Sequence, residues 1–101
     1  MTTYEWDEAK AEKNLRKHEV SFDDAREALE DPNLFYLPDR IYEGELRHQA
    51  IGQAGGVLLL MVAHTLRGDD EQTRVRIISA RPAERREQRL YRDSASRSTN
   101  Y

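Results

Sequence analysis

Six consecutive apolar residues, from Val57 to Val62, most constrain what this chain can fold into. The run continues to Thr65, follows a glycine pair and is closed by a polar loop. A membrane-spanning helix needs about 20 apolar residues, so the run is too short to cross a bilayer. A short apolar run between turn signals is typical of a strand covered on both faces, and a glycine pair is typical of a hairpin turn. The sequence therefore predicts a sheet with residues 57–65 as a central strand.

Two helices are expected before this strand. Asp7 is a good cap for a helix that runs to about His18, with acidic residues in its first turn and basic residues in its last. Ser21 is a good cap for a second helix, whose apolar residues recur at helical spacing and which ends before Pro32.

Further strands and a closing helix complete the prediction. The strands are residues 33–38, an edge strand ended by Pro38-Asp39, residues 46–52 and residues 75–80. Pro82 fits the first turn of a helix that runs to about Arg92. The predicted fold class is α+β: two N-terminal helices, a three- to four-stranded antiparallel sheet and a C-terminal helix. We expect one domain over residues 1–92 and a flexible tail over 93–101.

The chain has no cysteine, which excludes disulfides, thiolate metal sites and cysteine nucleophiles. This fits a reducing compartment. The first six residues have neither the basic start nor the apolar stretch of a signal peptide. We therefore expect a soluble cytoplasmic protein.

Charge is distributed unevenly along the 101 residues, whose formal net charge is −3. Residues 1–45 have a balance of −7, whereas residues 74–101 have a balance of +5 and carry arginine as their only basic residue type. Arginine binds phosphate through two parallel hydrogen bonds, so the basic end favours a phosphate ligand. A solvated row of arginine and glutamate on a helix is an equally simple interpretation.

Common catalytic motifs are absent, and the three histidines are too scattered to indicate a zinc site. The candidates for acid–base chemistry are His18, His48, His64, Glu45 and Tyr91, and those for charge stabilisation are Arg47, Arg74, Arg76 and Arg81. These residue types suit RNA cleavage without a metal, in which the 2′-OH attacks its own phosphate. Each also has a structural explanation, such as a cross-strand pair with Glu45 or a core position for Tyr91. The residues alone support a phosphate-handling surface and leave the reaction open.

Two long motifs add a resemblance. The opening, Trp6-Asp7-x-x-Lys10-x-x-x-Asn14-x-x-Lys17-His18-x-Val20-Ser21-Phe22-x-x-Ala25, resembles the N-terminal signature of the BrnT family of toxins. The ending, Arg76-Ile77-Ile78-Ser79-Ala80-Arg81-x-Ala83 followed by Tyr91, is similar to the C-terminal signature of that family, and Asp39, Glu45-x-Arg47 and Gly52 lie between them in the expected order. The resemblance covers about residues 4–92.

This resemblance implies a fold like that of RelE-type toxins, ribonuclease activity without a cofactor, and growth arrest through blocked translation. It also implies a cognate antitoxin with a ribbon-helix-helix-like DNA-binding part. The toxin would then contact DNA only through this antitoxin. The implied catalytic residues are His18, Glu45, Arg47, Arg76, Arg81 and Tyr91. The expected RNA-binding residues are Lys17, Arg74 and Arg85, and no metal ligand is expected.

The hypothesis assigns the scissile phosphate to Arg76 and Arg81. Glu45 or His18 would take the 2′-OH proton, and Tyr91 or His18 would assist the leaving oxygen. Because Arg76 and Arg81 have opposite parity along a strand, they converge only if the chain bends or bulges near Ala80, or if Arg81 already belongs to a turn.

Two positions depart from the family pattern. Pro82 follows Arg81 where relatives often have a basic residue, which removes one positive charge beside the proposed site. Glu19 stands where the family often has glycine, so the turn after His18 is expected to be looser or differently capped.

Two other classes of function remain open. In the first, the Arg-rich C-terminal segment belongs to a non-catalytic module that binds RNA or an acidic protein. In the second, the chain is a structural partner domain without RNA affinity. The acidic N-terminal half favours a partner role, because it repels RNA but suits a basic segment of an antitoxin.

Overall fold

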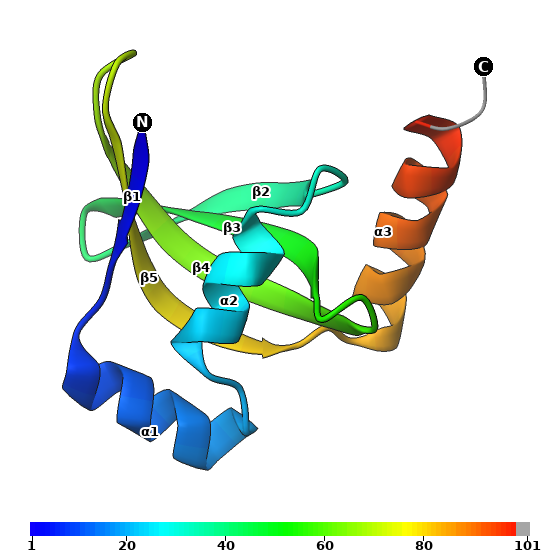
Figure 1. The fold of residues 1–101 in the computed structure, drawn as a ribbon, viewed down its shortest axis with the longest axis horizontal. Helices are drawn as coiled ribbons and strands as arrows, with labels where there is room; N and C mark the ends of the chain where they lie inside the picture. The colour runs from blue at the N-terminus through cyan, green and yellow to red at the C-terminus, as the bar shows by residue number, and fades with distance from the viewer. Residues whose placement is uncertain (99–101) are drawn as a thin grey trace.

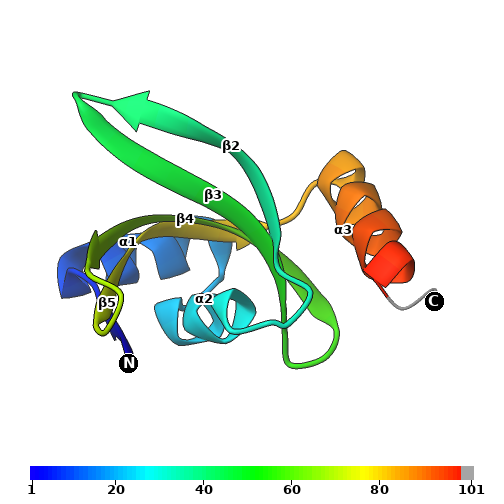
Figure 2. The same cartoon turned by 90° about the horizontal axis from the view of Figure 1, so that it is seen from above.

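A five-stranded sheet with the order β1-β5-β4-β3-β2 organises the protein (Figures 1 and 2). The computed structural model describes residues 1–98. Its elements are β1 (Thr2–Glu5), α1 (Glu8–His18), α2 (Phe22–Leu29), β2 (Phe35–Tyr42), β3 (Glu45–Ala54), β4 (Leu58–Gly68), β5 (Thr73–Pro82) and α3 (Arg85–Ser98). Helices α1 and α2 lie on one side of the sheet, and α3 stands apart from them, beside β2 and β3.

Both predicted N-caps are confirmed. The carboxylate of Asp7 accepts hydrogen bonds from the backbone N–H groups of Ala9 and Lys10, at 2.8 and 3.2 Å. The hydroxyl of Ser21 accepts one from the backbone N–H of Asp24 at 3.1 Å. These bonds satisfy donors that a helix start leaves without an intrahelical partner, which fixes where α1 and α2 begin.

The predicted fold class was wrong in its sheet. The sheet is mixed, because β1 pairs in parallel with β5, with Thr3 opposite Arg74 and Glu5 opposite Arg76. Strand β1 precedes both helices, so the chain does not open with two helices followed by an antiparallel sheet. The sequence gives no apolar run over Thr2–Glu5, because this short strand lies at the edge and most of its residues are exposed.

Proline positions explain two further differences. Strand β2 continues through Pro38 to Tyr42, because an irregularity between Leu37 and Arg40 removes the proline from the hydrogen-bonded ladder. Pro82 ends β5, opposite Leu60, and does not begin a helix. Helix α3 starts at Arg85 and continues to residue 98, so it includes most of the segment that was expected to fray. Residues 99–101 of that segment lie outside the described residues.

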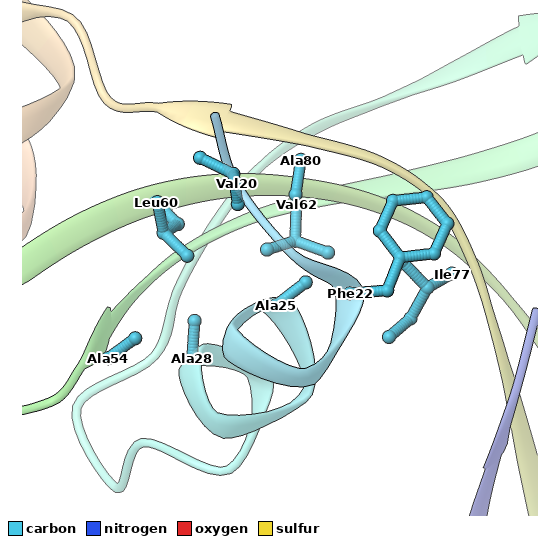
Figure 3. Packing of buried hydrophobic residues seen from close by; sticks show 9 residues of the cluster. All are labelled: Val20, Phe22, Ala25, Ala28, Ala54, Leu60, Val62, Ile77 and Ala80. Carbon is cyan, nitrogen blue, oxygen red and sulfur yellow. The ribbon is translucent and has the colours of Figure 1, made fainter. Parts of the chain in front are cut away.

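The central strand was predicted correctly, and it separates two apolar clusters. Alternate residues of β4, Leu60 and Val62, pack with Ala25 and Ala28 of α2 (Figure 3). Leu59 and Met61 point to the opposite face and pack with Tyr91 of α3. Because successive side chains of a strand point to opposite faces, β4 is covered by a helix on each side.

Two close contacts hold the helices on the sheet. A Cβ at Gly52 would lie 2.0 Å from the carbonyl oxygen of Ala28, so only glycine lets α2 approach β3 this closely. The buried side chain of Asn14 donates to the carbonyls of Val20 and Ala80 and accepts from the N–H of Ala80. This amide holds α1 against β5.

Within residues 1–98, no helix is long and apolar enough to span a bilayer.

Candidate functional site

A β-bulge in β5 brings the predicted arginines to one face of the sheet. Ser79 lies opposite Ala63, while Ile77 lies opposite the next residue, His64, so Ile78 is an extra residue. Ile77 and Ala80 consequently both face α2. Arg76 and Arg81 therefore both face away from α2. The extra residue shifts the alternation of side chains between the two faces of the sheet.

Four arginines from three adjacent strands surround a hollow of about 450 Å³ on this face. We call it the arginine hollow. Its lining residues are Glu5, Lys10, Glu45, Arg47, Arg67, Arg74, Arg76 and Ile78. They come from β1, α1, β3, β4 and β5, so the sheet as a whole assembles the site. Five cations against two carboxylates make the hollow electropositive.

Glu45 is the carboxylate of the hollow that pairs with two of these cations. Its oxygens lie 3.5 Å from Nε of Arg47 and 3.8 Å from Nη2 of Arg67. Arg47 is further held over the ring of Tyr42, 4.5 Å from the ring centroid. Arg74 and Arg76 have no carboxylate within ion-pair distance among residues 1–98, so their guanidinium groups can receive an anion.

Arg81 faces the same side of the sheet but is already paired. Its guanidinium donates to both carboxylate oxygens of Glu87, at 2.8 and 2.9 Å. This bond raises the pKa of Arg81 and lowers the pKa of Glu87. The pair joins the end of β5 to α3. Arg81 lines a second hollow and not the arginine hollow.

Tyr91 of α3 lies in the apolar cluster between this helix and the sheet. Its hydroxyl donates to Oδ2 of Asp31 at 2.5 Å, which ties α3 to the segment after α2. Burial, together with this bond to Asp31, raises the pKa of Tyr91 to about 12. The geometry therefore gives Tyr91 a structural contact, away from the arginine hollow.

The remaining predicted residues are also placed outside the arginine hollow. His18 and Lys17 lie in the last turn of α1, and Arg85 begins α3. His64 is 2% exposed on the side of the sheet that faces α2, where burial lowers its pKa. The ring of His48 lies 5.7 Å from that of His64, and its Nδ1 is 2.9 Å from a carboxylate oxygen of Asp39. Within residues 1–98, no cluster of three or more potential ligands is arranged to hold a metal ion.

Sequence reasoning missed three charged residues of the arginine hollow. Glu5 belongs to the unpredicted strand β1 and is placed beside Arg76 by the parallel pairing. Arg67 lies one residue before the end of the central strand, opposite Arg74. Lys10 stands in the N-terminal motif, and its position there was the available signal. The geometry thus brings Glu45, Arg47, Arg74 and Arg76 together and leaves His18, Lys17, Arg81, Arg85 and Tyr91 outside.

Residues 6–87 match the model of the ribonuclease toxin BrnT of type II toxin–antitoxin systems. The chain belongs to the BrnT family. The matched range includes every lining residue of the arginine hollow except Glu5. This membership confirms the family that the two sequence motifs resembled, and it implies an antitoxin as partner.

A solved structure agrees with the BrnT assignment. The structure of the BrnT ribonuclease toxin of Brucella abortus is similar with a TM-score of 0.61 and 26% identity, over 84% of this chain and 99% of that one. Among curated proteins, none matches the chain significantly.

Proposed function

We propose that this BrnT-family toxin is an endoribonuclease that works without a metal ion and cuts RNA in the arginine hollow. The observation that carries the proposal is the convergence of four arginines from three strands on the hollow that Glu45 lines, where two of them pair with Glu45. A phosphate group on this surface meets guanidinium groups whose backbone positions are set by the sheet, and such groups stabilise charge that develops on the phosphate. A carboxylate beside them is a suitable base.

The proposed reaction needs only groups that line this hollow. The carboxylate of Glu45 takes the proton of the 2′-OH, the O2′–P bond forms, and the P–O5′ bond breaks. Arg47, Arg74 and Arg76 stabilise the additional negative charge on the phosphorane. The ammonium of Lys10 gives a proton to the leaving 5′ oxygen. The products are a 2′,3′-cyclic phosphate and a 5′-hydroxyl, and no oxidant or cofactor enters the balance.

Lys10 replaces His18 and Tyr91 as the proposed proton donor, because Lys10 lines the hollow and the other two do not. Arg81 becomes a positioning residue, because its guanidinium is bound to Glu87.

Cleavage of total RNA in excess EDTA tests this proposal. The wild type is expected to produce 5′-hydroxyl and cyclic-phosphate ends. Glu45→Gln is expected to lower the rate about 10²- to 10⁴-fold, the range for a general base. Arg76→Ala is expected to lower it about 10²- to 10³-fold, the range for one charge-stabilising donor. Arg26→Ala, on the side of α2, serves as the matched control.

Two results would contradict the proposal. One is wild-type cleavage by folded Glu45→Gln and Arg76→Ala proteins. The other is cleavage that EDTA abolishes and Mg²⁺ restores. RNA that is retained without cleavage products would support the non-catalytic binding module.

We further propose that the cognate antitoxin neutralises the toxin and has a ribbon-helix-helix-like DNA-binding part. The support is the acidic surface of α2 and its C-cap, with Asp23, Glu27 and Glu30, which suits a basic segment. Co-expression of the antitoxin is expected to restore growth, and the complex, but not the toxin alone, is expected to bind operator DNA. Operator binding by the toxin alone would contradict this assignment.

A further inference from the structure

A second hollow of about 470 Å³ lies on the same sheet face as the arginine hollow. We call it the helix hollow, because α3 forms one of its walls. Its lining residues are Leu37, Pro38, Asp39, Arg40, Gln49, Met61, Arg81, Arg86, Glu87 and Leu90. Gln49 of the helix hollow and Arg47 of the arginine hollow are two residues apart on β3, about 7 Å along the strand. An extended RNA strand can therefore reach from one hollow to the other within one nucleotide.

The walls of the helix hollow combine apolar and amide groups. Leu37 and Met61 of the sheet face Leu90 of α3 and provide an apolar surface against which a flat ring can stack. Gln49 presents a side-chain amide that has no hydrogen-bond partner within residues 1–98. Such an amide both donates and accepts, so it can read the edge of a nucleobase.

The charges around the helix hollow favour a phosphate at its rim. Glu87 is bound to Arg81 and Asp39 to His48, so both lining carboxylates already have a cationic or ring-nitrogen partner. Arg40 and Arg86 are exposed and make no ion pair within residues 1–98. Guanidinium groups in this position can hold the phosphates that flank a base.

We propose that the helix hollow is a nucleobase subsite for single-stranded RNA, which binds the base next to the scissile phosphate and prefers adenine. The preference follows from Gln49, because a glutamine amide forms two hydrogen bonds with the edge of adenine. The inference rests on the proposed function for the position of the cut, but the binding of a nucleotide can be measured independently.

Nuclear magnetic resonance titration of the full chain with AMP, GMP, CMP and UMP tests the subsite itself. AMP is expected to bind most tightly and to shift the side-chain amide of Gln49 and the methyl of Met61. Gln49→Ala is expected to weaken AMP binding about tenfold. Gln72→Ala, the same change in an exposed loop, is the matched control. If Gln49→Ala does not fold, Gln49→Glu removes the amide donor at nearly constant size and is expected to weaken AMP similarly.

Sequencing of the cut ends tests the role of the subsite in cleavage. Wild-type cuts are expected next to adenine, and the cuts made by Gln49→Ala are expected to show no such preference. Cleavage by the wild type without base preference would overturn the subsite and leave the proposed function intact. Absence of cleavage would overturn the proposed function, and the titration then decides the subsite alone. Two results of the titration would overturn the subsite. One is that AMP changes chemical shifts only in the arginine hollow, and the other is that the Gln49→Ala and Gln72→Ala proteins bind AMP with equal affinity.

Discussion

Glu19 adopts a backbone conformation that glycine normally occupies. It caps α1 in the left-handed region with φ of 58°, and its N–H donates to the carbonyl of Leu15. The helix thus keeps the left-handed cap that family members often build with glycine. The cap is not looser, but it is strained, because a side chain makes this conformation costly.

Glu19→Gly is therefore expected to stabilise the protein by about 1 kcal/mol. Glu12→Gly, in the right-handed interior of α1, is expected to destabilise it by about 1 kcal/mol. Urea denaturation of the two variants measures both effects. A Glu19→Gly protein no more stable than the wild type would show that the cap carries no strain.

His64 links stability to pH. It is buried, so its pKa lies below the ordinary value, and its neighbour His48, whose Nδ1 is held by Asp39, lowers it further. The unfolded state therefore takes up a proton before the folded state does as the pH falls. The stability that neutral His64 provides is complete above about pH 6.5 and is lost as the pH falls from there through its lower folded pKa.

Urea denaturation at pH 7.5 and 5.5 checks this sign. His64→Gln is expected to lose less stability between these two values than the wild type. His18→Gln, at the end of α1, is expected to retain the wild-type loss. An equal loss in the wild type and His64→Gln would contradict the prediction.

At the scale of elements, α3 depends on a carboxylate at its start. Glu87 accepts two hydrogen bonds from Arg81 and one from the N–H of Glu84. It therefore joins the helix to β5. Arg81 lowers the pKa of Glu87. The stability that this ion pair provides is therefore complete above about pH 4.5, and it is lost as the pH falls through the lower pKa of Glu87 in the folded state.

Glu87→Gln is expected to increase hydrogen exchange across α3 while the amides of β4 stay protected. The matched control is Glu84→Gln, because Glu84 is mostly exposed and lies 4.0 Å from Arg81. Equal exchange in α3 of the two variants would show that the Glu87 pair does not hold the helix.

The elements also show what the sequence could predict. Helix caps and the apolar central strand are local patterns, so Asp7, Ser21 and the run 57–65 predicted their elements correctly. Strand β1 depends on a partner about 70 residues away, and its four residues Thr2–Glu5 contain no apolar run. Pro82 is compatible with a helix start and with a strand end, and only the pairing with β4 decides between them.

The candidate site was predictable in its residue types but only partly in its membership. Arg76 and Glu45 were expected to converge, and both line the arginine hollow. The bulge at Ile78 explains how Arg76 and Arg81 share a face, but no residue pattern could show that Glu87 already binds Arg81. Partners of that kind are set by tertiary packing.

At the scale of the whole molecule, charge separates onto two surfaces. The arginine hollow lies on one face of the sheet, and the acidic residues of α2 lie on the other side. We therefore expect an RNA strand to be attracted to one face and repelled from the other, which would orient it before contact.

Salt dependence measures this separation. Arg74→Ala is expected to weaken RNA binding and to reduce the slope of log affinity against log salt by about 0.7, the value for one phosphate contact on a single strand. Arg26→Ala, on the side of α2, is expected to leave the slope unchanged. If the Arg74→Ala protein has the wild-type slope, Arg74 does not contact the RNA phosphates.

The parallel pairing of β1 with β5 also sets the order of events during synthesis. Glu5 leaves the ribosome early, but its neighbour Arg76 follows about 70 residues later, at about 5–20 residues per second. A nascent chain therefore has no completed basic face during the seconds in which most of it is translated. The arginine hollow is therefore completed only after β5 has emerged and paired with β1.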